Sequence, residues 1–361
     1  MKIVFVLHSL FGGGAERVIS VISKCLANEG SEVLLITNTF GISEYEISKE
    51  VKIIPFYRSA KQGYSRFKLF YQILTVRTVM INNPEAIVVG VMPTMFLVVA
   101  IASLFLKNRI VASDHTSFER PLKWHMNFIR KYVYKKADAV TMLTKTDYSF
   151  LKDWFKEKYV MPNPLAYTPI DRIETPREKK ILAVGRLDDW EVKGFDLLIE
   201  AWAKIAKSHT DWKLEIAGKG SASSVEYLKN IAKQHNVRDN FVLSGFHSDI
   251  DKVMRESPIF ALTSRHEGFG LVLIEAMSQG CACISFDCGG RQREIIEDGV
   301  SGIIVDNHDV NKLAEQLEYL IDNQEKRLQL ASNGIKRSND FNLDIITERW
   351  ISMFHHLKAQ S

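Results

Sequence analysis

Two carboxylates eight positions apart are the residues whose types and spacing point most directly to chemistry. Glu267 stands before Gly268-Phe269-Gly270-Leu271, and Glu275 falls about one turn inside a helix expected over Leu271–Gln279. The glycines form a turn whose backbone N–H groups can face an anion at the start of the helix. The carboxylates are too far apart to serve one proton-transfer centre, so we expect different roles for them. The alternative is a helix-entry Glu and a surface Glu without a ligand.

Two cations are associated with a different apolar run, Lys180–Leu187. Arg186 stands near the end of this run, and Lys193 precedes a helix expected over Phe195–Ala206. Cations at the carboxyl end of a parallel strand can hold a diphosphate, with Arg acting as a fork and Lys as a point charge. The alternative is that both side chains are simply solvated.

A third candidate is the run Gly12-Gly13-Gly14, between an apolar strand and a helix, where the backbone could approach an anion. A dinucleotide fingerprint needs a further glycine where this chain has Arg17, and an acidic residue after the second strand, where Thr37-Asn38-Thr39 stand. A nicotinamide dehydrogenase is therefore disfavoured. A tight turn without a ligand remains the alternative.

Apolar runs of strand length alternate with helical spacing along the whole chain. Such continuous runs predict parallel sheets covered on both faces. The pattern restarts at Lys180, and four of the nine prolines lie within Tyr159–Pro176, the expected linker. We therefore predict two doubly wound α/β domains, over residues 1–165 and 166–340, and a C-terminal helix over 341–361 that packs back on the first domain. Strands are expected at Lys2–Leu7, Val33–Ile36, Lys52–Pro55, Ile87–Val91, Arg109–Ser113, Ala139–Leu143, Lys213–Ala217, Phe241–Ser244, Ile259–Leu262 and Ala282–Ser285.

Composition supports a folded chain of two domains with different charge. The 361 residues are 46% hydrophobic and 25% charged, and the net charge of +4 divides into +9 over residues 1–170 and −5 over the remainder. The four cysteines show no C-x-x-C spacing, so neither zinc nor a disulfide framework is expected. The uncharged segment Ala86–Leu106 is divided by Pro93 and reads as a strand and a helix rather than a bilayer span. Without a signal peptide, we expect a cytoplasmic location.

Together these residues resemble the glycosyltransferases of family four. That family has the GT-B fold, two facing Rossmann-like domains with an interdomain cleft, and is retaining and independent of metal. The resemblance covers essentially the whole chain and rests on the glycine loop, His115 after a strand, Arg186 with Lys193, and the E-x7-E element Glu267–Glu275. It implies a hexosyltransferase, as in bacterial surface polysaccharide, lipopolysaccharide or O-antigen biosynthesis. Neither a cofactor nor a metal is expected, because the nucleotide-sugar is a substrate.

The same resemblance implies roles for individual residues. Arg186 and Lys193 would bind the donor's diphosphate as leaving group, Glu267 would hold the donor sugar and stabilise charge, and His115 would line the pocket near the sugar. Glu275 would bind the ribose hydroxyls, and Phe246 would contact the base. The remaining donor-binding positions are Gly12, Gly13, Gly14, Gly268, Phe269, Gly270 and Leu271.

Aromatic residues accompany cations in two stretches of the basic half. The first stretch, Arg58–Arg77, contains Tyr64, Phe67, Phe70 and Tyr71, and Tyr57 stands just before it. The second, Arg120–Lys136, spaces Trp124, Phe128 and Tyr132 four apart, with Arg130 elsewhere around the helix. This pattern predicts a peripheral site for an anionic membrane, on the cytoplasmic face of an inner membrane. Aromatics in the core with solvated cations are the alternative. Nucleic acid is disfavoured because no recognised motif is present and the total charge is modest.

The function predicted from the sequence is transfer of a hexose or N-acetylhexosamine from a UDP-sugar to a lipid-linked oligosaccharide or polysaccharide. GDP-mannose is the alternative donor, since the family uses both nucleotides. Two other classes stay open, a nucleotide-sugar binding protein without transfer and an epimerase on a similar fold.

Overall fold

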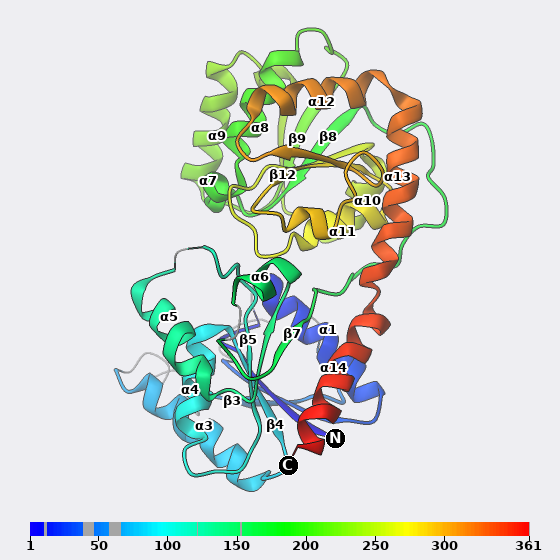
Figure 1. Cartoon of the computed structure of the whole chain (residues 1–361). Helices are drawn as coiled ribbons and strands as arrows, with labels where there is room; N and C mark the ends of the chain where they lie inside the picture. The colour runs from blue at the N-terminus through cyan, green and yellow to red at the C-terminus, as the bar shows by residue number, and fades with distance from the viewer. Residues whose placement is uncertain (11–12, 39–46, 58–65, 121, 152–153, 361) are drawn as a thin grey trace. The chain divides into compact units, whose positions relative to one another are not determined.

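The computed structural model describes residues 1–10, 13–38, 47–57, 66–120, 122–151 and 154–360. The chain divides into two compact units (Figure 1). Unit 1 consists of Met1–Pro164 together with Leu343–Ser361, and unit 2 is Leu165–Asn342.

Unit 1 is built on a parallel sheet in the order β3-β2-β1-β4-β5-β6-β7, among the residues described. Its strands are β1 (Lys2–Val6), β2 (Glu32–Thr37), β3 (Lys52–Pro55), β4 (Ile87–Val91), β5 (Ile110–Ser113), β6 (Ala139–Met142) and β7 (Lys158–Val160). Its helical segments are α1 (Gly14–Asn28), α3 (Lys68–Asn82), α4 (Met92–Ala102), α5 (Trp124–Phe128), the π-turn η1 (Ile129–Val133), η2 (Tyr134–Lys136), α6 (Lys145–Phe150) and α14 (Leu343–Ala359).

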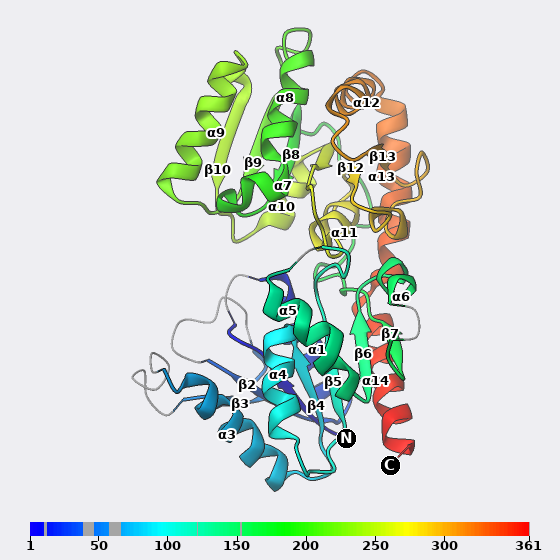
Figure 2. The same cartoon turned by 60° about the vertical axis from the view of Figure 1, so that its left-hand side comes forward.

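Strand alternation assigns the helices of unit 1 to the two faces of its sheet. Val4 and Val6 of β1 belong to the core formed with α3 and α4, whereas the Phe5 ring lies 6.0 Å from that of Trp350 in α14. Figure 2 shows α3, α4 and α5 on one side of the sheet and α14 on the other. The C-terminal helix therefore packs on the sheet of unit 1, beside α1.

Unit 2 repeats the parallel arrangement in the order β10-β9-β8-β11-β12-β13. Its strands are β8 (Lys180–Val184), β9 (Lys213–Ala217), β10 (Phe241–Gly245), β11 (Ile259–Leu262), β12 (Ala282–Asp287) and β13 (Ile303–Asp306). Its helices are η3 (Leu187–Asp189), α7 (Trp190–Lys193), α8 (Phe195–Ile205), α9 (Ala222–Gln234), η4 (Arg238–Asn240), α10 (Ile250–Glu256), α11 (Leu271–Ser278), η5 (Gln292–Glu294), α12 (Val310–Asp322), α13 (Gln324–Ser338) and η6 (Asn339–Phe341).

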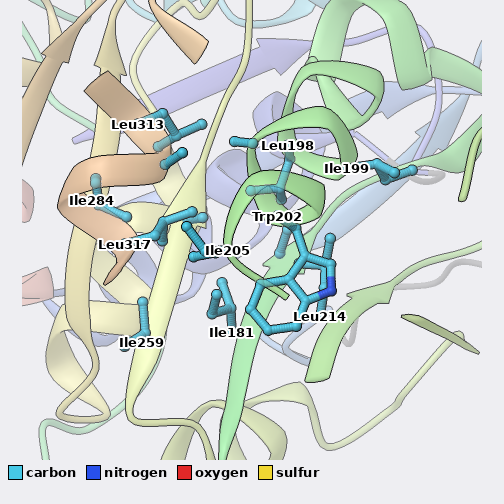
Figure 3. Packing of buried hydrophobic residues seen from close by; sticks show 14 of the residues in the cluster. Ile181, Leu198, Ile199, Trp202, Ile205, Leu214, Ile259, Ile284, Leu313 and Leu317 are labelled. Carbon is cyan, nitrogen blue, oxygen red and sulfur yellow. The ribbon is translucent and has the colours of Figure 1, made fainter. Parts of the chain in front are cut away.

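The core of unit 2 explains why α8 and α12 form where they do. Apolar residues recur at helical spacing on α8, and Leu198, Trp202 and Ile205 are buried against Ile181 of β8 and Leu317 of α12 (Figure 3). This packing fixes the start of α8, and with it the turn before Phe195, against the carboxyl ends of β8 and β11.

The predicted α/β fold with two doubly wound parallel sheets is confirmed. The expected strands are present with ends shifted by at most a few residues, whereas β7 and β13 were not anticipated. The segment Ala86–Leu106 forms β4 and α4, as expected. Within the described chain, no helix is long and apolar enough to cross a membrane.

Candidate functional site

The candidate site of unit 2 lies where the sheet order reverses. β8 is flanked by β9 and β11, so the segments that follow β8 and β11 diverge at their carboxyl ends, where open α/β sheets bind ligands. Lys193 comes after β8 and Glu267 after β11, and the Lys193 ammonium donates to Glu267 Oε1 over 2.7 Å. Ser264 Oγ also donates to this oxygen, over 2.8 Å. The structure therefore brings two of the predicted site residues into direct contact.

The position of Lys193 depends on the turn at Gly194. Gly194 has φ 63°, and a Cβ added to it would lie 1.9 Å from the carbonyl oxygen of Thr263. The Thr263 hydroxyl donates to the carbonyl oxygens of Lys193 and Gly194, at 3.1 and 3.0 Å. Only glycine permits this close approach of the two segments.

Arg265 and Asp196 form a second clamp between the same segments. The Arg265 guanidinium makes a bidentate pair with the Asp196 carboxylate, with N–O distances of 2.8 and 2.7 Å. The Arg265 backbone N–H also donates to the Val192 carbonyl over 2.8 Å. Planar, two-pronged pairing fixes orientation as well as distance. The loop that carries Glu267 is thus held to the turn that carries Lys193.

The Lys193–Glu267 pair still has capacity for a ligand. An ammonium has three donors, and the contact with Glu267 uses one of them. Both hydrogen bonds to the Glu267 carboxylate within the described chain end on Oε1, which leaves Oε2 as an acceptor for a hydroxyl. The Lys193 stem passes over Gly185 at the end of β8, because a Cβ built there would lie 3.4 Å from Lys193 Cγ. One cation and one carboxylate can therefore contact the phosphate and the sugar of the same molecule.

The other predicted residues of unit 2 also follow carboxyl ends of strands. Arg186, after β8, is largely exposed and pairs with Asp189 over 2.7 Å. Phe246, after β10, is 62% exposed, and the Lys219 ammonium lies 4.3 Å from its ring centroid. Glu275 is buried inside α11.

Within the glycine-bracketed loop before α11, two residues are buried and one adopts a left-handed conformation. Phe269 packs edge-on against the ring of Phe341 at 5.6 Å, and Gly270 has φ 104° at the N-terminus of α11. Gly268 is half-buried, and Leu271 begins the helix. The loop thus ends in a glycine turn at the N-terminus of α11, where the Leu273 N–H donates to the Gly270 carbonyl over 2.8 Å.

His115 and the glycine loop lie at the carboxyl ends of strands in unit 1. His115 follows β5, and its Nε2 lies 3.1 Å from Ser113 Oγ. Burial lowers the pKa of His115 to about 4, so the imidazole is neutral at pH 7. Gly13 caps α1 and Gly14 begins it, whereas Gly12 lies outside the described residues. A Cβ added to Gly14 would meet no atom of the described residues within 4 Å, so their packing does not require a glycine there.

Cys288 is a buried thiol beside the loop that carries Glu267. Cys288 lies near Glu267, but burial raises the pKa of its thiol to about 12, and its Sγ donates to the Ser264 carbonyl over 2.7 Å. It is a structural contact of the loop. In the part of the chain that the structure describes, no three His, Cys, Asp or Glu side chains gather as metal ligands.

Sequence reasoning missed the residues that hold the site together. Thr263, Arg265 and Asp196 carry no motif, because their partners lie about seventy positions away in the sequence. One signal was available in the sequence: Asp196 follows Lys193 by three positions, with a glycine between them. This spacing places the Asp196 carboxylate in the first turn of α8, close to the cation.

Comparisons with known proteins agree with the class that the fold defines, a protein of two doubly wound α/β units. Residues 12–165 match the model for Glycosyltransferase Family 4, and residues 170–337 match that for Glycosyl transferases group 1. The amylovoran biosynthesis glycosyltransferase AmsD of Erwinia amylovora is 30% identical over 347 residues, which cover 94% of this chain and 95% of that protein. The chain therefore belongs to the family 4 glycosyltransferases with the GT-B fold, and it is a transferase.

Two further relatives span the full length. A Campylobacter jejuni protein is 26% identical and covers 99% of both chains; it is an alpha-1,4-N-acetyl-D-galactosaminyltransferase that acts on a GalNAc-containing undecaprenol diphosphate glycan. The crystal structure of the Anabaena protein HepE in complex with UDP has a TM-score of 0.82 at 19% identity and covers 99% of this chain and 100% of its own. That likeness shows the shared fold.

Proposed function

We propose that the protein is a retaining glycosyltransferase that moves a hexose or N-acetylhexosamine from a UDP-sugar to a lipid-linked glycan of a bacterial surface polysaccharide. The observation that carries this proposal is the contact of Lys193 with Glu267 at the switch point of unit 2, over 2.7 Å. The pair offers a cation for a diphosphate and a carboxylate for a sugar hydroxyl side by side.

The choice of donor and acceptor is supported by the relatives. The Campylobacter relative acts on an undecaprenol-linked glycan, and the Anabaena relative was solved with UDP. UDP is the proposed nucleotide on this basis, and Phe246 with Lys219 is the proposed contact for the base. An exposed ring with a cation over one face leaves its other face open to stack on a base.

The proposed chemistry is stabilisation of a leaving group. When the bond between the anomeric carbon and the diphosphate breaks, negative charge develops on the diphosphate oxygens. Lys193, Arg186 and the N–H groups at the start of α11 would reduce the cost of that charge. Glu267 would hold the sugar, and the neutral His115 would contact the sugar without adding a charge. This mechanism requires no metal.

The donor can be identified with a panel of UDP- and GDP-sugars, measured by thermal shift and by release of nucleotide with and without a lipid-linked acceptor. We expect stabilisation by one or a few UDP-sugars and acceptor-dependent release of UDP. Preference for GDP-mannose would replace the proposed donor. Binding without turnover would indicate a binding protein, and conversion of the donor sugar without acceptor would indicate an epimerase.

The proposal includes an anionic membrane surface as a partner of unit 1. Trp124, Phe128 and Tyr132 are 81%, 53% and 50% exposed, and Phe67 and Phe70 are each 60% exposed. The alternative in which these aromatics belong to the core does not hold for these five side chains. Exposed cations accompany them, namely Arg66, Lys68, Lys123, Lys131, Lys135 and Lys136. Near an anionic bilayer each such cation contributes about 1 kcal/mol.

Two residues of the expected membrane surface lie elsewhere. Tyr57 is 5% exposed and belongs to the core, and Arg130 is 5% exposed and paired inside the unit. Arg58, Lys61 and Tyr64 lie outside the described residues.

Vesicle co-sedimentation at low salt tests the membrane proposal. We expect stronger binding to anionic than to neutral vesicles, and weaker binding of the double variant Trp124→Ser/Phe128→Ser. Phe150→Ser, which removes a 49% exposed ring from α6, is the matched control and should bind like the unmodified protein. Equal binding to neutral and anionic vesicles would count against the proposal.

A further inference from the structure

Arg130 is a buried cation in a segment whose other cations face solvent. It lies in the π-turn η1, directly after α5, and only 6% of its side chain is exposed. On a helix, a residue two positions after Phe128 falls on nearly the opposite face, so Arg130 lies away from the exposed aromatic rings. Trp124 and Phe128 stay on the surface, whereas Arg130 turns into unit 1.

The Arg130 guanidinium is bound mainly by one carboxylate, that of Asp114. Arg130 Nε lies 2.8 Å from Asp114 Oδ2 and Nη2 lies 2.9 Å from Oδ1. The Tyr134 hydroxyl donates to the same Oδ2 over 2.9 Å, and the Thr116 N–H donates to Oδ1 over 3.0 Å. Arg130 Nη1 donates to the Ser117 carbonyl over 3.0 Å. The cation thus binds both the carboxylate and the backbone of the loop after β5.

Stability alone is a weak reason for such a pair. Removing two charges from water costs several kcal/mol, and an apolar replacement of similar size is often as stable. What the pair does fix is the geometry of one loop. That loop carries His115, and the two residues before it are held: Asp114 by Arg130, and Ser113 by the Thr141 hydroxyl, which donates to Ser113 Oγ over 2.9 Å.

We propose that Arg130 and Tyr134 are positioning residues for His115, acting through the Asp114 carboxylate and the backbone of residues 113–117. This proposal rests on the proposed function only for the role of His115 in transfer. The contacts and charges of the network can be measured without any turnover.

The network also controls the charge beside the imidazole. Asp114 is the charged group that acts on His115, and its negative charge opposes the effect of burial on the pKa of the ring. Arg130 and Tyr134 contact Asp114 directly, and Asp147 acts on Arg130 from α6. Without the guanidinium, the negative charge of Asp114 beside His115 would be uncompensated, and the imidazole would take up a proton at higher pH.

The first experiment is NMR titration of the whole protein labelled at histidine, with the His115 signal identified by its loss in His115→Gln. We expect Arg130→Met to raise the pKa of the His115 imidazole by about one unit or more. Arg109→Met is the matched control, because it removes an Arg–Asp pair of 2.8 Å that is 28% exposed on the same sheet. An unchanged His115 titration in folded Arg130→Met would overturn the proposal.

The second experiment keeps the charge and removes the fork. Arg130→Lys should leave the His115 titration near its original position but lower kcat about 10-fold or more, because a misplaced group loses orientation. Tyr134→Phe should lower kcat less. An unchanged kcat in Arg130→Lys would overturn the positioning role. This test holds even if Arg130→Met fails to fold. If the unmodified protein transfers no sugar while the NMR shift is observed, the proposed function fails and the network stands.

Discussion

At the scale of residues, the site depends on a few polar groups whose charges are set by their surroundings. Lys193 and Glu267 neutralise each other at 2.7 Å, so a donor meets a preformed pair rather than two free charges. His115 is neutral because burial lowers its pKa to about 4. A neutral ring can accept or donate a hydrogen bond without adding a charge at the carboxyl end of β5.

The depressed pKa of His115 predicts how stability depends on pH. Between its ordinary value near 6.5 and about 4, the unfolded chain binds a proton that the folded chain does not. Stability should therefore fall as pH drops through this window, by up to about 3 kcal/mol from this residue. Urea unfolding of unit 1 should show a shallower pH dependence in His115→Gln. Equal pH dependence in both proteins would contradict the assignment.

At the scale of elements, the site is made by two loops that are clamped to each other. The turn between α7 and α8 meets the loop after β11 through Gly194, Thr263 and the Arg265–Asp196 pair. The core under α8 and the strand order bring these loops together. Their relative position should then matter more for activity than for stability.

Arg265→Ala tests the clamp. We expect kcat/KM for the donor to fall about 10- to 100-fold, because Lys193 and Glu267 lose their fixed separation. The free energy of unfolding should fall by about 1 kcal/mol or less, since the pair is partly exposed to solvent. Arg265→Lys should restore little of the lost kcat/KM. Arg255→Ala, which removes an exposed pair with Asp251 on α10, is the control. Wild-type kinetics in Arg265→Ala would show that the clamp is not needed.

Two glycines allow folding and function to be separated. Gly194→Ala would bring a Cβ within 1.9 Å of the Thr263 carbonyl at φ 63°, so we expect a loss of about 1–3 kcal/mol and a lower melting temperature. Gly14→Ala meets no atom within 4 Å and should leave stability unchanged or slightly higher. If the donor's phosphates approach the start of α1, Gly14→Ala should still raise the KM for the donor. An unchanged KM would remove the glycine loop from the site.

At the scale of the whole molecule, the architecture can be predicted from the sequence better than the contacts between distant residues can. Runs such as Lys2–Leu7 and Lys180–Leu187 are apolar enough to identify buried parallel strands, and the family motifs place Lys193 and Glu267 at strand ends. β7 was missed because it has three residues of intermediate burial. The burial of Arg130 was not anticipated because its partner, Asp114, lies sixteen positions earlier in the sequence. Contacts between distant segments depend on packing, which periodicity does not record.

The charge asymmetry of the chain acquires a more specific meaning at this scale. The basic half contains the exposed aromatic surface of unit 1, whereas the acidic half contains Lys193 and Arg186. Net charge therefore agrees with the proposed membrane surface of unit 1, but it is a poor guide to the proposed donor site. That proposal rests on individual side chains that follow β8 and β11.

The most direct test of the central claim is sugar transfer by Lys193→Ala and Glu267→Ala, with the preferred donor and a lipid-linked acceptor. Both variants should lose transfer by at least about 100-fold, as expected for the loss of leaving-group stabilisation, while their melting temperatures show that they fold. Lys204→Ala removes an exposed lysine of α8 that faces Glu200, and it should transfer normally. Near-normal turnover in Lys193→Ala or Glu267→Ala would contradict the account.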